Sequence, residues 1–250
     1  MNVKLNFIPK QIFRWQLISI CSLVLISFIS SLFYRYSSLS QIQGFGVGFL
    51  SVDVEASIVT WYSALLLLLC AILLAVITLR KSRTNSRYIH HWRILALIFI
   101  FLSIDETISI HEKLIFPLRS ALNTGGIFHF AWIVVYIPLV AIFVIFYLRF
   151  LAHLPKTTRQ LFWLSGTTYV AGAIGFEMIG GPIAETFGEE ALPYLISVHF
   201  EEGLELLGLT IFVYGLLDYI SFYIENLTVC FKPEKELVVP QPKMNKARQL

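Results

Sequence analysis

Long apolar runs separated by short polar segments dominate the chain. Three of these runs, 15–34, 58–79 and 120–148, contain no Asp, Glu, Lys or Arg. An α-helix of about 20 residues crosses the roughly 30 Å hydrocarbon core of a bilayer, because each residue adds about 1.5 Å. The pattern therefore predicts helices that span a membrane.

Further stretches are equally long and mostly apolar but carry acidic residues toward one end. With them, the sequence predicts six transmembrane helices, at 15–34, 58–79, 92–116, 127–148, 161–180 and 197–222. We expect Pro117 to end the third helix and Gly180-Gly181-Pro182 to end the fifth, because these residues do not readily continue a helix. Pro138 should kink the fourth.

The fold class that follows is all-α. We expect a polytopic membrane protein with a single six-helix domain over residues 15–222, preceded by a short basic arm over residues 1–14. Residues 223–250 are polar and contain several prolines. Such a segment cannot bury enough apolar surface to fold, so we expect a disordered tail.

Composition supports a membrane protein and excludes some alternatives. The chain is 57% hydrophobic, against roughly 45–50% apolar residues in an average soluble protein, and its mean hydropathy is +0.74. A net charge of +3 gives no reason to expect a nucleic-acid partner. Cys21, Cys70 and Cys230 form no CxxC pair, which argues against thiol redox chemistry. The expected partner is the lipid bilayer.

Basic residues are distributed unevenly over the predicted topology. Six helices leave both termini on one side, and that side collects every Lys and Arg except Arg35, Lys113 and Arg119. Loops rich in Lys and Arg stay in the cytoplasm. We therefore expect cytoplasmic termini and a multi-pass location in a bacterial inner (plasma) membrane.

Acidic residues show the opposite bias. Most of them map to the outer half of the predicted bundle, where His111, His129 and His199 join them. Ionisable groups inside a membrane are costly, so they usually have both a partner and a function. A concentration of negative charge attracts metal ions, other cations or protons.

The third predicted helix carries the densest group of these residues. At 100° per residue, Asp105, Ser109 and Glu112 share one face, and Glu106 and His111 lie on either side of it. At a rise of about 1.5 Å per residue, Asp105 should lie roughly 10 Å below the outer surface.

Two other helices bring carboxylates to a similar depth. On the sixth, His199, Glu202 and Glu205 follow one another at i, i+3 and i+6 and spread over roughly 120°. On the fifth, Glu177 shares a stripe with small residues that would admit a close neighbour. The small residues of this stripe are Gly166 and Ala173.

Several carboxylates within a few Å of one another cannot all be ionised unless a positive charge lies between them. Carboxylate and imidazole groups together are a ligand set for iron, manganese or zinc. We therefore predict a site for a divalent metal, with acid/base roles for Glu112 and Glu202. The expected metal ligands are Asp105, His111, Glu177, His199 and Glu205.

Purely structural roles are the alternatives. Asp105 and Glu112 could form hydrogen bonds to Ser or Tyr on a neighbouring helix, and Glu106 and Lys113 could form a pair at the membrane surface. Acidic residues of the predicted loops would then simply face water. These residues are Asp53, Glu55, Glu185, Glu189 and Glu190.

Several short motifs give the chain a resemblance to a known family. They are Leu102-Ser103-Ile104-Asp105-Glu106 with His111-Glu112, Gly175-Phe176-Glu177, Glu201-Glu202-x-x-Glu205, and Thr60-Trp61-Tyr62-Ser63 at the start of the second helix. With them the chain resembles a family of six-helix bacterial membrane proteins that has no assigned activity. The resemblance covers most of residues 50–217. It implies the architecture and the choice of site residues, but no function.

Three classes of function fit these observations. The first hypothesis is a metal-dependent membrane enzyme that acts on a lipid, a quinone or another apolar molecule entering from the outer leaflet. The second is a proton- or cation-coupled transporter whose acidic layer binds the ion. The third is a non-catalytic assembly protein that binds a partner through its acidic face or its basic tail.

Overall fold

The computed structural model describes residues 2–4, 8–36, 57–83, 86–223 and 228–230. It divides into two units. In the smaller unit, β1 (Asn2–Lys4) pairs antiparallel with β2 (Thr228–Cys230). The strand β1 lies in the predicted arm, and β2 is the described part of the predicted tail. The other unit contains all of the described helices.

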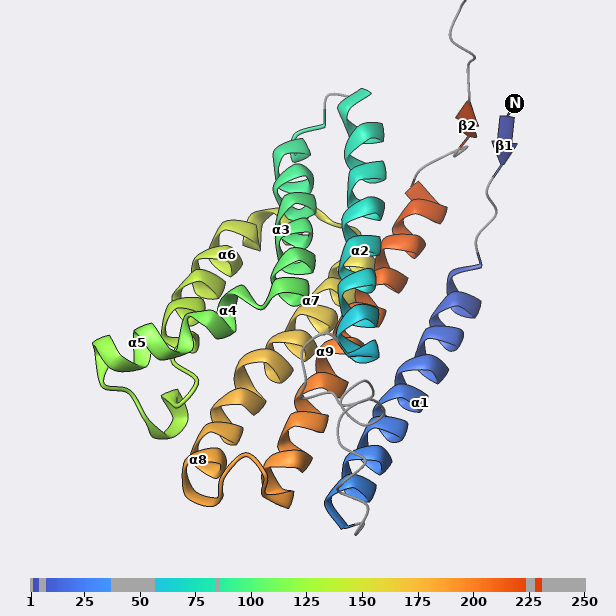
Figure 1. Cartoon of the computed structure of the whole chain (residues 1–250). Helices are drawn as coiled ribbons and strands as arrows, with labels where there is room; N and C mark the ends of the chain where they lie inside the picture. Colours follow the sequence, from blue (N-terminus) through green and yellow to red (C-terminus); the bar gives the residue numbers. More distant parts are fainter. Residues whose placement is uncertain (1, 5–7, 37–56, 84–85, 224–227, 231–250) are drawn as a thin grey trace, which may run out of the picture. The chain divides into compact units, whose positions relative to one another are not determined.

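Within the described parts of the chain, four helices are long and apolar enough to cross a membrane: α1 (Pro9–Tyr36), α2 (Ile58–Arg83), α6 (Ile133–His153) and α9 (Leu192–Tyr223). Figure 1 shows them together with α3 (Ile89–Ile108). The helix α3 meets the same test when it is joined to the bent segment that follows it, which makes up to five candidate spans among the described residues. The prediction of an all-α protein with several helices that could span a membrane is confirmed.

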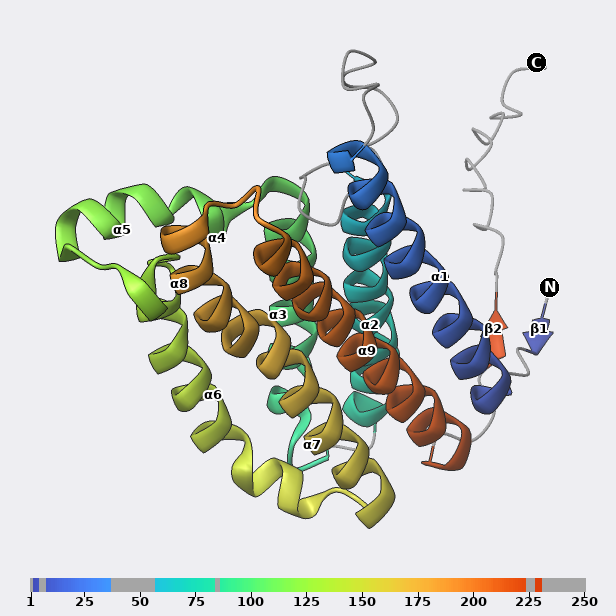
Figure 2. The same cartoon turned by 90° about the horizontal axis from the view of Figure 1, so that it is seen from below.

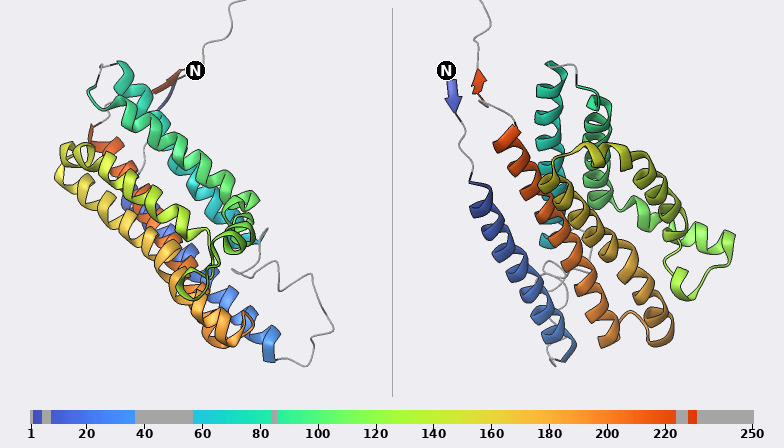
Figure 3. Two further views of the ribbon diagram at one scale, coloured as in Figure 1. Left: turned by 90° about the vertical axis from the view of Figure 1, so that its left-hand side faces the viewer. Right: turned by 180° about the vertical axis from the view of Figure 1, so that it is seen from behind.

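The third predicted helix, 92–116, does not exist as one straight element. It breaks at Ser109, where φ is +53° and the backbone is left-handed. Two short helices follow, α4 (Ile110–Lys113) and α5 (Ile115–Leu122), and the axis bends by 65°. Figure 3 shows α4 and α5 leaving the axis of α3. Pro117 lies in the first turn of α5, where the missing N–H costs little, so the expectation that it ends a helix was wrong.

The fifth predicted helix is longer than expected. It comprises α7 (Lys156–Val170), a π-helical segment η2 (Ala171–Phe176) and α8 (Glu177–Phe187). The predicted stop at Gly180-Gly181-Pro182 was wrong, and the helix ends instead before Gly188, with φ of +83°. A Cβ on Gly181 would lie 2.7 Å from the Gly126 carbonyl oxygen, so this glycine permits close packing rather than a chain break.

The helix α9 is the central element of the helical unit. It contacts α1, α2, α7, η2 and α8, and α2 in turn packs against α3. Figure 2 shows α9 lying between α1 and α7. Its buried residues extend along nearly its whole length, from Tyr194 to Ile220. Side chains on α9 therefore pack against α1 and α2 as well as against the run of α7, η2 and α8.

Glycines let α7 approach α9 closely. A Cβ on Gly208 would lie 2.8 Å from the backbone nitrogen of Tyr169, and one on Gly215 would lie 3.2 Å from Leu161. Close backbone contact through small residues is the usual way in which helices associate inside a bilayer. The turn η1 (Gly126–Phe128) packs against α8 in a similar way.

Candidate functional site

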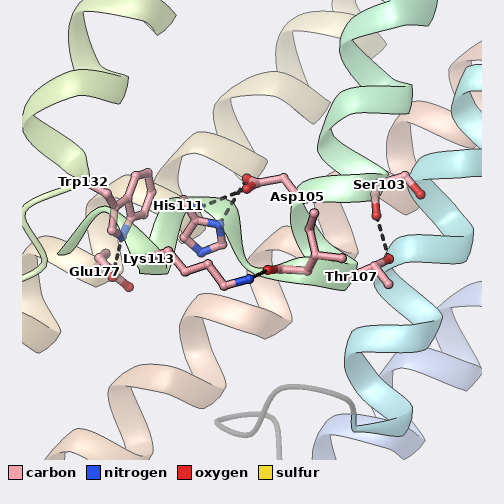
Figure 4. A network of polar contacts seen from close by, with 8 residues as sticks. Ser103, Asp105, Thr107, His111, Lys113, Trp132 and Glu177 are labelled. Atoms are coloured by element: carbon pink, nitrogen blue, oxygen red, sulfur yellow. Dashed lines mark hydrogen bonds and ion pairs between the residues drawn. The ribbon is translucent and has the colours of Figure 1, made fainter. Parts of the chain in front are cut away.

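Asp105 and His111 form a tight pair across the break between α3 and α4 (Figure 4). Asp105 is 5% exposed. Its Oδ1 accepts a hydrogen bond from the backbone nitrogen of His111 at 3.0 Å, and its Oδ2 lies 3.1 Å from the ring Nδ1. An ionised carboxylate only accepts hydrogen bonds, so Nδ1 donates and Nε2 is the nitrogen that can exchange a proton.

The break itself places these two groups together. The backbone nitrogen of Ser109 donates to the carbonyl of Asp105 at 2.6 Å and ends α3 in a left-handed residue. The chain then turns back, and the side chain of Asp105 binds the first turn of α4. The predicted face of Asp105, Ser109 and Glu112 is therefore absent, because it assumed a continuous helix.

Trp132 at the start of α6 connects this pair to α8. Its ring meets the ring of His111 edge to face, with 5.1 Å between centroids. Its indole Nε1 donates to Oε1 of Glu177 at 3.0 Å, as Figure 4 shows. Tyr136, one turn along α6, forms a hydrogen bond with Asp105. Residues at the start of α6 thus contact both the Asp105–His111 pair and the carboxylate of Glu177 on α8.

Glu177 and Glu201 bring two carboxyl groups into contact. Glu177 is the first residue of α8, directly after the π segment, and Glu201 lies on α9. Their side chains lie within hydrogen-bonding reach of each other. Two ionised carboxylates have no proton to donate, so a hydrogen bond between them requires a shared proton.

A third point of contact surrounds Glu205, one turn further along α9. Its carboxyl forms a hydrogen bond with the hydroxyl of Tyr169, and Glu106 and His111 lie close enough to interact with it electrostatically. Glu106 in turn forms a hydrogen bond with Ser63 of α2. Carboxylates from α3, α8 and α9 therefore share one region.

We refer to these groups as the acid cluster. Its members are Asp105, Glu106, His111, Glu177, Glu201, Glu202 and Glu205. Asp105 is buried, and the other members are half-buried and keep part of their surface accessible.

Some predicted site residues lie outside the cluster. His199 is buried, and its Nδ1 donates to the Leu195 carbonyl at 2.7 Å while Nε2 lies 3.2 Å from the Ser27 hydroxyl of α1. Nδ1 is thus engaged within α9 itself, and Nε2 links α9 to α1. Glu112 is exposed on α4, where its charge acts on His111. Asp53 and Glu55 lie outside the described residues.

Polar residues beside the cluster form a separate contact. Glu185, expected to face water only, accepts a hydrogen bond from the backbone nitrogen of Gly126. Arg119 donates to the carbonyl of His129, whose ring nitrogen lies 4.0 Å from the carboxylate of Glu185. Burial and then the charge of Arg119 lower the pKa of His129 below its usual 6.5.

The glycine that admits the acids of α9 was missed by the sequence prediction. A Cβ on Gly172 would lie 2.7 Å from the Glu201 carbonyl oxygen and 3.0 Å from Cγ of Glu205. The prediction named Gly166, where a Cβ would meet nothing within 4 Å. A π segment, with its i→i+5 hydrogen bonds, changes the register of the faces that follow, and such segments often occur at functional sites.

Metal binding finds no geometric support here. Within residues 8–36, 57–83 and 86–223, no group of three or more His, Cys, Asp or Glu side chains is placed to hold a metal ion. The acids interact in pairs and through Tyr169 and Trp132 instead. Hydroxyl and indole groups thus lie against these carboxyl groups where a metal site would place further ligands.

Comparison with known proteins places the chain by family alone. No curated protein and no solved structure matches it. A family described as a domain of unknown function (DUF8692) matches residues 17–220. This range includes the whole acid cluster and all of the candidate spans except the first residues of α1 and the last of α9. The chain belongs to the DUF8692 family.

Proposed function

We propose that this protein takes up and releases protons at the acid cluster and belongs to the class of proton- or cation-coupled membrane transporters. The observation that carries the proposal is the contact between the carboxyl groups of Glu177 and Glu201. Two unit charges about 4 Å apart repel by about 4 kcal/mol at an effective dielectric constant near 20. One shared proton removes this repulsion.

The charges of the neighbouring groups also support proton binding at the acid cluster. Glu201 is close enough to Glu177, Glu202 and Glu205 to feel the charge of each of them. The nearby group that can become positive is His111, which interacts with Glu205 and Asp105. Loss or gain of a proton at one member therefore changes the proton affinity of the others, and this coupling is what a proton-driven device needs.

A route for protons can be traced from the surface inward. Glu112 is exposed and acts on His111, and Nε2 of His111 is the nitrogen left for exchange once Asp105 holds Nδ1. His111 also acts on Glu205. The proposed order is entry beside Glu112, transfer at His111 and storage among the carboxyl groups of α8 and α9.

The proposed topology has six spans with both termini in the cytoplasm. The continuous run of α7, η2 and α8 would be the additional span, lined with small and polar residues because it faces α9 and the cluster. Basic residues at the α2–α3 and α6–α7 turns support a cytoplasmic location for that end. The cluster would then lie toward the outer leaflet.

Proton uptake by purified protein tests the proposal. The pH of a weakly buffered sample is lowered from alkaline values through neutrality, and a pH-sensitive dye reports the protons bound per protein. We expect Glu201→Gln and Glu177→Gln each to bind fewer protons than wild type. Glu189→Gln, which replaces an exposed carboxylate before α9, should leave the uptake near neutral pH unchanged. Identical uptake near neutral pH in wild type and Glu201→Gln would refute it.

A flux measurement then tests transport itself. Protein is reconstituted in liposomes, a membrane potential is imposed, and internal pH is followed with and without candidate solutes. We expect a solute- or potential-driven pH change that is lost in Glu201→Gln and kept in Glu189→Gln. A wild-type protein that binds protons at the cluster but moves none across the membrane under any gradient would contradict transport.

A metal-dependent membrane enzyme is the second candidate, and the Asp105–His111 pair favours it. A carboxylate that holds one nitrogen of a histidine commonly orients the other toward a metal ion. Iron, manganese or zinc bound at His111 with Glu106 or Glu205 could activate water or oxygen for an apolar substrate. Elemental analysis of purified protein beside a Glu177→Ala/Glu205→Ala double variant separates the two functions, because a stoichiometric metal lost in the variant would favour the enzyme.

A further inference from the structure

A cavity of about 200 Å³ lies at the end of the bundle where the α2–α3 and α6–α7 turns meet the last turns of α9. It is separate from the acid cluster. Aromatic side chains form most of its wall, and the lining includes Lys81, Tyr88, Trp92, Phe150, His153 and Tyr219. None of the described residues that line it is acidic.

Positive charge is held directly against the aromatic wall. The ammonium group of Lys81 lies 5.5 Å from the centroid of the Tyr219 ring. The ring of His153 packs against Tyr88 at 4.9 Å, and the guanidinium of Arg87 lies over the same Tyr88 ring at 5.5 Å. Cations that are close to aromatic rings are partly desolvated, so an anion that enters meets a stronger attraction than in open water.

Two helix N-termini add to this positive field. Tyr88 immediately precedes α3 and Pro155 immediately precedes α7, and both residues line the cavity. Neither helix has a hydrogen bond from a capping side chain, although the backbone nitrogen of Ile89 at the start of α3 donates to the carbonyl of Ser86 at 3.2 Å. The backbone N–H groups at a helix N-terminus and the helix dipole favour a negatively charged ligand.

The aromatic residues that line the cavity favour an anion that also carries an apolar part. Tyrosine and tryptophan at the end of a membrane bundle lie at the depth of lipid headgroups, where one side of the ring is apolar and the other is wet. A small inorganic anion would need only the charges. A ligand that also covers the half-buried ring of Tyr88 and the exposed ring of Tyr223, which both line the cavity, needs an apolar part.

We propose that this cavity binds a phosphate-bearing group, with Lys81 and His153 contacting the phosphate and the aromatic wall covering the adjoining apolar part. The phosphate can come from a phospholipid headgroup or from free phosphate. Binding here would tie the α2–α3 turn to the α6–α7 turn and to the end of α9. It is independent of the proton chemistry proposed for the acid cluster.

Native mass spectrometry of the full chain in detergent tests the proposal. Three probes are compared: phosphatidylglycerol, diacylglycerol with the same acyl chains, and inorganic phosphate. We expect retention of phosphatidylglycerol and not of diacylglycerol, with about tenfold weaker binding in Lys81→Gln, because a hydrogen bond to a charged group is worth about 1.5 kcal/mol or more. Competition by inorganic phosphate alone would identify free phosphate as the source and would still support the site.

Control variants separate loss of the binding site from a general loss of positive charge. Arg149→Gln removes one positive charge from an exposed position on α6 that does not line the cavity, so binding should be unchanged. His153 is exposed, so His153→Gln should fold normally and should weaken binding in the same direction as Lys81→Gln. Equal loss in Lys81→Gln and Arg149→Gln, or equal binding of diacylglycerol and phosphatidylglycerol, would overturn the proposal.

Discussion

The carboxylate of Asp105 binds both the backbone nitrogen and the ring of His111, at 3.0 and 3.1 Å. The Asp105 side chain thus closes the break between α3 and α4 and orients His111 within the acid cluster. Stability of the bend and proton chemistry at His111 should therefore change together when Asp105 is altered.

Asp105→Asn should destabilise the protein. The amide keeps one oxygen acceptor but presents an NH₂ group where the second oxygen stood, so one of the two contacts to His111 is lost together with the negative charge. Charge-assisted hydrogen bonds contribute about 1.5–3 kcal/mol, and a loss of that order should appear in chemical unfolding in detergent. Glu189→Gln is the control. Equal stability of Asp105→Asn and wild type would show that the contact does not hold the bend.

Ser109→Gly should make the protein more stable. Ser109 has φ of +53°, and a left-handed backbone costs a residue with a Cβ roughly 1 kcal/mol more than glycine. Unfolding experiments should show a gain of up to about that size, and Ser109→Val should show a loss. Ser165→Gly, inside α7, should destabilise by about 0.5–1 kcal/mol. A Ser109→Gly variant as unstable as Ser165→Gly would contradict the left-handed conformation.

Gly172→Ala should separate η2 from α9 and weaken proton uptake at the cluster. The added methyl group would lie 2.7 Å from the Glu201 carbonyl oxygen, so the helices must move apart by a few tenths of an ångström or more. Gly175→Ala adds the same methyl group three residues later, where nothing lies within 4 Å. Both variants are compared by thermal unfolding and by proton uptake. If the two behave alike, the close approach at Gly172 is not needed.

The free energy of unfolding should decrease as the pH is lowered through the range in which His129 becomes protonated. The folded state lowers its pKa, so below the usual 6.5 the unfolded chain binds more protons than the folded one. The contribution of neutral His129 is therefore fully present above about pH 6.5 and is lost as the pH falls through the lower folded value. Unfolding free energies measured between pH 7 and 5 should have a smaller slope in His129→Gln. An unchanged slope would contradict the shift.

The apolar pattern predicted the long helices well because it depends on length and hydropathy alone. Runs 15–34, 58–79 and 197–222 lie inside α1, α2 and α9. Breaks and continuations were predicted poorly. Ser109 carries no signal for a left-handed turn, and the Gly180-Gly181-Pro182 run that signals a stop in water is accommodated inside α8 by packing.

The composition of the candidate site was predicted better than its geometry. Charge alone indicated that acids of the third, fifth and sixth predicted helices lie near one another, and Glu106, Glu177 and Glu205 do interact. Helical periodicity then paired Asp105 with Glu112, whereas the break pairs it with His111. His199 looked equivalent to the cluster acids on α9, yet its ring faces α1, which only tertiary packing could decide.

Infrared spectroscopy tests the shared proton most directly, because a protonated carboxyl group and an ionised carboxylate absorb in separate bands. We predict that wild-type protein at pH 7 shows a carboxylic-acid band that is lost or strongly reduced in Glu201→Gln and unchanged in Glu189→Gln. Fully ionised carboxylates in the wild-type spectrum at pH 7 would contradict a proton held between Glu177 and Glu201.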